Sequence, residues 1–271
     1  MSFDKPAIVA EGLGKSYWVG GHKLIDSMGM HALVDRALTS PGRVVTRLIG
    51  QKKPTSHYPE IPGHMKWALR NVSFSLEWGE VLGIVGHNGA GKSVLLKLLS
   101  RITRPTEGHA ILRGRVGSML EAGTSFHGEL TGRENIQLSG AILGMRRSEI
   151  NRRMDEIIEF SQVEEYIDTP VKRYSTGMVL RLGFSVAAHL DTDIMLIDEV
   201  LAVGDQQFKR RCIDKMRSVA KSGKTVLFVS HDMDVLKDIS DRAILIREGS
   251  LVMKGSPEDV VEEHLKNAGR S

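Results

Sequence analysis

The sequence is poor in cysteine and contains no long apolar segment. Its single cysteine, Cys212, excludes an intramolecular disulfide and a zinc site built from several thiolates, and it suits a reducing compartment. No run reaches the ~18 to 20 consecutive apolar residues that cross a bilayer, and the first residues lack the apolar core of a signal peptide. We therefore expect a cytosolic location, with any role at a membrane being peripheral.

A strong charge of one sign, internal repeats and heptad patterns are also absent. The 271 residues have a formal net charge of +4 and a pI near 9.1, because 37 basic residues are mixed with 33 acidic ones. This balance does not indicate a nucleic-acid partner. With 41% hydrophobic residues, the chain can bury a full core as one large domain or as one domain with a subdomain.

A glycine-rich segment between an apolar strand (81–85) and an apolar helix (from 94) carries the most information. It fits the pattern G-x-x-x-x-G-K-[ST] and reads Gly86-His87-Asn88-Gly89-Ala90-Gly91-Lys92-Ser93. In such a loop, successive backbone N–H groups and the helix N-terminus face one anion. Lys92 can reach the β- and γ-phosphates of a nucleotide, and the Ser93 hydroxyl can ligate Mg²⁺. The alternative is an ordinary glycine-rich turn from strand to helix.

Apolar runs and turn signals predict an alternation of strands and helices around this loop. Thr131 and Glu134 form a predicted capping box at the start of a mainly helical block, residues 132–190. Residues 18–65 are polar and basic and look inserted. Strands are expected at 7–10, 72–76, 81–85, 110–112, 116–120, 194–197 and 225–229, with a helix at 206–221, a hairpin formed by 243–246 and 251–253, and a last helix at 257–266.

Two further segments follow strands that we expect to be buried and parallel. Asp198 and Glu199 end the strand 194–197, and His231 follows the strand 225–229. The carboxyl ends of such strands form the ligand-binding edge of the sheet. We predict that Asp198 serves Mg²⁺ indirectly, through a bound water, that Glu199 orients or deprotonates the attacking water, and that His231 contacts the γ-phosphate or that water. A solvated acidic pair and a structural histidine are the alternatives.

The order of the motifs resembles that of the ATP-binding cassette (ABC) family, from about residue 8 to residue 253. Between the phosphate loop and the acidic pair, Ser175 and Gly177 begin an apolar helix, as in the family's signature segment. The resemblance implies an α/β fold: an ABC-type P-loop ATPase cassette with a RecA-like core, an antiparallel β-subdomain and a helical subdomain. It also implies that ATP and Mg²⁺ are bound.

The same resemblance implies a homodimer in which Ser175 and Gly177 contact the γ-phosphate held by the other copy. Asp205 matches the acidic residue of the segment that crosses the dimer interface. Tyr17 matches the aromatic residue that stacks on adenine, although a packed surface tyrosine is the alternative.

Departures from the family pattern point to one branch. The signature reads Ser175-Thr176-Gly177-Met178, and with residues 121–136 and 200–205 it is similar to the ATPase subunits that export lipid-linked polysaccharides. The resemblance implies two integral-membrane permease subunits as partners, a position on the cytoplasmic face of the inner membrane, and O-antigen, or else capsule or teichoic acid, as cargo. The alternatives are a soluble cassette ATPase that acts on nucleic acid or a protein complex, and a drug or lipid exporter.

Three features of this chain stay open at the level of sequence. Glu121 stands where most cassettes carry a glutamine that touches Mg²⁺, and it either serves the metal or is a structural loop residue. Residues 44–49 would form a basic amphipathic helix that lies either at a membrane or permease surface or on its own domain. We expect residues 1–271 to form one nucleotide-binding domain, in which 255–271 add only a short helix and no carbohydrate-binding domain.

Overall fold

A computed structural model describes residues 5–19, 64–120, 125–198 and 206–268. The chain forms two units, residues 1–15 with 67–271 and residues 16–66. The described part of the second unit consists of residues 16–19, the last residues of strand β1 (Ile8–Val19), and residues 64–66, the first residues of strand β2 (His64–Leu76). The predicted amphipathic helix at 44–49 lies outside the described residues.

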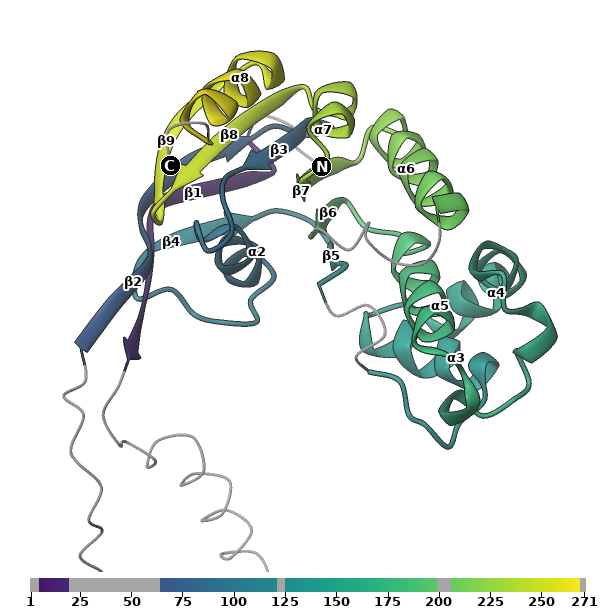
Figure 1. Ribbon diagram of the computed structural model, residues 1–271. Coiled ribbons are helices and arrows are strands. Elements are labelled where there is room, and N and C mark those ends of the chain that lie inside the picture. The colour runs from purple at the N-terminus through teal and green to yellow at the C-terminus, as the bar shows by residue number, and fades with distance from the viewer. Residues whose placement is uncertain (1–4, 20–63, 121–124, 199–205, 269–271) are drawn as a thin grey trace, which may run out of the picture. The chain divides into compact units, whose positions relative to one another are not determined.

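A six-stranded sheet in the order β5-β6-β7-β3-β8-β9 forms the centre of the larger unit (Figure 1). The first five strands in this order are parallel, and β9 runs antiparallel to β8. Every residue of β3, β6 and β7 is buried, as expected for parallel strands that are covered on both faces. The bounds are β3 Val81–Val85, β5 Val116–Ser118, β6 Ile194–Ile197, β7 Thr225–Val229, β8 Arg242–Arg247 and β9 Ser250–Gly255.

Helices cover both faces of this sheet (Figure 1). Alternate residues of β3 point to opposite faces, so that Leu82 and Ile84 pack with α2 (Lys92–Leu99). Val81 and Val85 belong to the core on the other face, to which α6 (Gln206–Lys221), α7 (Met233–Ile239) and α8 (Pro257–Ala268) contribute. A second sheet, in the order β2-β1-β4 with β4 at Glu107–Leu112, shares its core with α2.

The segment of the chain between β5 and β6 is helical, as predicted. It contains α3 (Gly132–Ile142), α4 (Arg147–Ser161), the short 3₁₀ turns Glu164–Tyr166 and Val171–Arg173, and α5 (Thr176–Ala188). The predicted capping box is confirmed, because the Thr131 hydroxyl accepts from the Glu134 N–H at 3.2 Å and the Glu134 carboxylate accepts from the Thr131 N–H at 2.8 Å.

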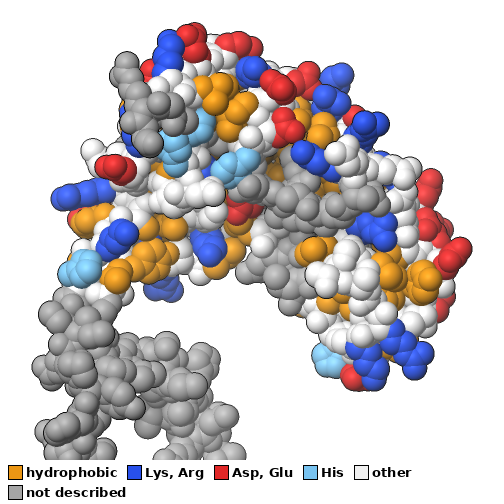
Figure 2. Space-filling view, in the orientation of Figure 1, with side chains coloured by type: hydrophobic (Ala, Val, Ile, Leu, Met, Phe, Trp, Pro, Cys, Tyr) orange, Lys and Arg blue, Asp and Glu red, His pale blue; other side chains and the backbone are white. Residues whose placement is uncertain are grey.

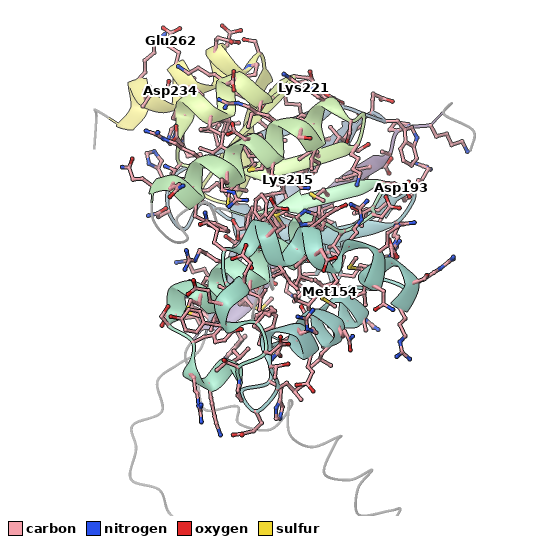
Figure 3. The ribbon with its side chains drawn as sticks, turned by 90° about the vertical axis from the view of Figure 1, so that its right-hand side faces the viewer. Met154, Asp193, Lys215, Lys221, Asp234 and Glu262 are labelled. Carbon is pink, nitrogen blue, oxygen red and sulfur yellow. The ribbon has the colours of Figure 1, made fainter. Side chains whose placement is uncertain are left out.

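The helical block has its own buried core, into which Met154 points from α4 (Figure 3). The rings of Phe160 and Phe184 stack on each other, and both make edge-on contacts with Phe208 of α6, which joins this block to the sheet's core. Within the described part of the chain, no helix combines the length and the apolar character that crossing a membrane requires.

Candidate functional site

The glycine-rich loop leaves the carboxyl end of β3 and enters α2, as the sequence predicts. A side chain on Gly86 would collide with the backbone carbonyl of Ile246 in β8. At Gly91, where φ is 108°, a Cβ would lie 2.5 Å from the carbonyl oxygen of Ala68. Glycine is therefore required at both positions, because the loop passes directly against two neighbouring strands.

The turn between β8 and β9 holds this loop in place. The Gly249 N–H donates to the Ala90 carbonyl at 3.0 Å, and the Gly249 carbonyl accepts from the Arg70 N–H at 2.8 Å. Within the loop, the Ala90 N–H donates to the His87 carbonyl at 3.1 Å. These bonds fix the curl of the backbone before α2 begins.

Lys92 places a buried cation inside the curl of the loop. Its Nζ donates to the carbonyl oxygens of Gly86 at 2.5 Å and His87 at 3.0 Å, and the residue is only 7% exposed. A buried charge needs such partners, because it has lost its hydration. The adjacent Ser93 is exposed at the first turn of α2, where the helix N-terminus favours an anion.

Asp198 and His231 lie at the same edge of the sheet as this loop. The strands β6, β7 and β3 are parallel neighbours in that order, and each of these segments follows the carboxyl end of its strand. Asp198 is half-buried and His231 is exposed. The prediction that the loop, the aspartate and the histidine share one edge is confirmed.

The residues that flank His231 order its backbone. The Ser230 hydroxyl accepts from the Asp232 N–H at 3.0 Å, and Asp232 caps α7 by accepting from the Val235 N–H at 3.3 Å. The second carboxylate oxygen of Asp232 pairs with the Lys209 ammonium at 3.3 Å. The His231 imidazole thus lies in a turn that the hydrogen bonds of Ser230 and Asp232 hold in shape.

Ser175 and Gly177 begin α5 in the helical block. The Ser175 hydroxyl caps α5 by accepting from the Met178 N–H at 3.2 Å. Among the described residues, a Cβ on Gly177 would approach only the Ser175 hydroxyl oxygen, at 3.9 Å, so a side chain would have room there.

Of the other predicted site residues, one belongs to the second unit and three lie outside the described residues. Tyr17 is near the end of β1, in the unit formed by residues 16–66, and 42% of its surface is exposed. Glu199, Asp205 and Glu121 lie outside the described residues, so their predicted roles stay predictions.

The residues of the loop fit a nucleotide phosphate with Mg²⁺. A buried ammonium and the start of a helix offer positive charge and N–H donors, and the glycines keep side chains out of the curl. The Ser93 hydroxyl and the Asp198 carboxylate are oxygen donors of the kind that Mg²⁺ prefers. The arrangement can therefore bind a phosphate chain and its metal ion.

Sequence reasoning missed one residue beside the loop. His264 of α8 lies with its ring centroid 4.7 Å from that of His87, so the last described helix reaches the phosphate loop. The signal was present: Val260, Val261 and His264 share one face of a helix, by the spacings i, i+1 and i+4, and the first two are apolar. A histidine on an apolar face is a candidate for a buried contact.

Comparisons with known proteins agree with this geometry. Residues 69–202 match the protein family described as "ABC transporter". An "O-antigen export system ATP-binding protein RfbB" from Klebsiella pneumoniae is 47% identical over 209 residues, which cover 77% of this chain and 85% of the relative. A "Teichoic acids export ATP-binding protein TagH" from Listeria monocytogenes is 41% identical over 198 residues, which cover 73% of this chain and 59% of the relative.

Solved structures share the fold at low sequence identity. The dimeric post-hydrolysis structure of the ATP-binding cassette MJ0796, bound to ADP and Pi, has a TM-score of 0.65 at 19% identity and covers 92% of this chain and 98% of that one. The ATP-binding subunit of an ABC transporter has a TM-score of 0.68 at 18% identity and covers 95% and 92%. The predicted α/β cassette fold is confirmed.

Replacing Lys92 tests the buried ammonium. Lys92→Ala removes a cation that is held against the loop, and hydrogen bonds to charged groups contribute about 1.5–3 kcal/mol each. We expect ATP binding, measured by equilibrium titration, to weaken by about ten- to a hundredfold. Lys97→Ala, on the exposed side of the same helix, is the matched control and should bind as the unchanged protein does. Equal affinities of the two variants would contradict the assignment.

Proposed function

Because the chain belongs to the ABC transporter family, we propose that it is the ATP-hydrolysing subunit of an exporter of lipid-linked polysaccharide. The observation that carries this proposal is the 47% identity to an O-antigen export ATP-binding protein over 85% of that relative. O-antigen is therefore the first candidate cargo. The teichoic acid relative and the resemblance to capsule exporters keep those polymers as the next candidates.

The phosphate loop binds the nucleotide in this proposal. The backbone N–H groups of the loop surround the β- and γ-phosphates, and the Lys92 ammonium turns from the loop carbonyls to phosphate oxygens. The close packing of Gly86 and Gly91 against neighbouring strands supports this role, because it fixes the loop before nucleotide arrives. Tyr17 stacks on the adenine ring.

The residues at the sheet edge act on the γ-phosphate and its attacking water. Glu199 orients the water and accepts its proton, and His231 donates a hydrogen bond to the γ-phosphate. Ser93 directly, and Asp198 through a water, would hold Mg²⁺, which would supply positive charge against the phosphates. Support comes from the shared edge of β3, β6 and β7, which brings Asp198 and His231 to the side of the sheet where the loop lies.

A second copy of the chain completes each site. Ser175 and Gly177 contact the γ-phosphate that the partner holds, and Asp205 lies at the interface between the copies. The space at Gly177 supports this role, since the described residues leave room there for another surface to approach. ATP closes the dimer and hydrolysis reopens it.

The homodimer drives two permease subunits from the cytoplasmic face of the inner membrane, where it is held peripherally. Residues 1–271 act as one nucleotide-binding domain, and specificity for the polymer lies mainly in the permease. Residues 18–65 contact either the membrane or permease surface or their own domain, and the helical block at 132–190 faces the permease.

Replacing Glu199 tests the hydrolytic assignment. Glu199→Gln keeps the size of the side chain but removes the base, and general-base catalysis contributes about 10²- to 10⁴-fold to rate. We expect kcat for ATP hydrolysis to fall within that range while ATP affinity is retained. Glu164→Gln, an exposed glutamate of the helical block, is the control and should hydrolyse normally. Near-normal turnover of Glu199→Gln would reject the role of this residue.

Deleting the gene tests the cargo. Without the ATPase, we expect full-length polysaccharide to disappear from the cell surface while lipid-linked polymer accumulates on the cytoplasmic side of the membrane. The unchanged gene should restore export, and the Lys92→Ala gene should not. Both fractions are measured by gel analysis of the polymer. Normal surface polymer without internal accumulation would reject polysaccharide as the cargo but not the ATPase.

A further inference from the structure

The helix α8 presents an inward face that reaches the phosphate loop. It begins after Ser256, whose hydroxyl accepts from the Asp259 N–H at 3.2 Å. Val260 and Val261 are buried in the core that α6, α7 and α8 form on one face of the main sheet, whereas Glu262 points away from the protein (Figure 3). His264 lies one turn beyond Val260, so the same inward face carries it toward the loop.

The contact that His264 makes is a ring contact with the loop itself. The centroids of the His264 and His87 rings are 4.7 Å apart and their planes are tilted by 52°. Figure 2 shows histidine side chains close together on the face beside α8. His87 is exposed and lies between Gly86, which has no room for a side chain, and Asn88. The His264 ring therefore contacts the loop directly after Gly86, where the backbone has no room for a side chain.

Packing alone does not explain why a histidine, with a polar ring nitrogen, is buried at position 264. Only 9% of its surface is exposed, and its Nδ1 has no hydrogen-bond partner among the described residues. Leaving a buried polar atom unpaired costs about 1–3 kcal/mol, which an apolar residue at this position would avoid. Burial is the largest cause of a lowered pKa of the His264 ring, and the neighbouring groups His87, Lys92, His231 and Arg247 lower it further.

A second residue of α8 contacts the hairpin that packs against the phosphate loop. Glu263 pairs with Arg247 at 3.7 Å, at the end of β8. Arg247 follows Ile246, whose carbonyl closes the space at Gly86, and it precedes the turn whose Gly249 N–H holds the Ala90 carbonyl. Glu263 thus pairs with the hairpin that packs against the phosphate loop, and the adjacent His264 contacts the loop itself.

We propose that His264 is a positioning residue for the phosphate-binding loop, acting through its contact with His87. The ring holds His87 against the protein and keeps the first half of the loop in the curl that receives a phosphate. This role rests on the proposed function, since it concerns ATP binding by the same loop. It adds to that site a residue from α8, more than 170 positions along the chain from the loop.

A double-variant cycle tests this role. The dissociation constant of a fluorescent ATP analogue is measured for the unchanged protein, His264→Ala, His87→Ala and the double variant. We expect His264→Ala to weaken binding roughly two- to tenfold, the range that contact couplings of 0.5–1.4 kcal/mol give, and to raise KM for ATP with kcat changed less than about twofold. The double variant should bind no more weakly than His87→Ala alone.

Two controls separate positioning from general stabilisation. Leu265→Ala alters a neighbouring residue that is 56% exposed and should leave binding and KM unchanged. His264→Phe keeps an aromatic ring against His87 and should recover most of the affinity. If His264→Ala does not fold, His264→Leu, which is similar in volume and has no ring, replaces it in the cycle.

The outcomes distinguish this inference from the function on which it rests. A lowered melting temperature of His264→Ala with unchanged nucleotide affinity would overturn the positioning role, as would additive effects in the double variant. Failure of the unchanged protein to bind the ATP analogue would contradict the proposed function instead.

Discussion

The site depends on the close passage of one backbone loop between neighbouring strands. Gly86 lies against the carbonyl of Ile246, and Gly91 lies against that of Ala68, so the loop has a single path from β3 to α2. The Lys92 ammonium then occupies the inside of the curl, bonded to two loop carbonyls. Because these contacts exist within the folded chain, the binding shape does not have to be built when a phosphate arrives.

The order of the strands in the sheet brings Asp198 and His231 to the same edge as this loop. The segments after β6 and β7 come from positions more than 100 residues beyond the loop, yet their strands are its neighbours in the sheet. Parallel pairing puts all their carboxyl ends on one edge. The buried strands β6 and β7 thus fix where Asp198 and His231 leave the sheet.

Local patterns made much of this arrangement predictable. The strands at 81–85, 194–197 and 225–229, the hairpin, the capping box at Thr131 and the helix that begins at Ser175 are all found where the sequence predicts them. These features are signalled by neighbouring residues, so they can be read without tertiary contacts. The contact of His264 with His87 could not be read in this way, because it depends on how α8 packs, and the strand β1 extends to Val19, beyond the predicted 7–10.

The proposal that a second copy of the chain completes each nucleotide site is tested most directly by the mass of Glu199→Gln in solution with ATP and Mg²⁺, with and without a second change, Gly177→Asp. We expect Glu199→Gln to pass from the 29.9 kDa monomer to a dimer on adding ATP. Gly177→Asp should leave the fold intact, since a Cβ has room there, and each single copy should still bind nucleotide at its own phosphate loop, but the protein should stay monomeric. An ATP-dependent dimer that persists with Gly177→Asp would contradict the claim.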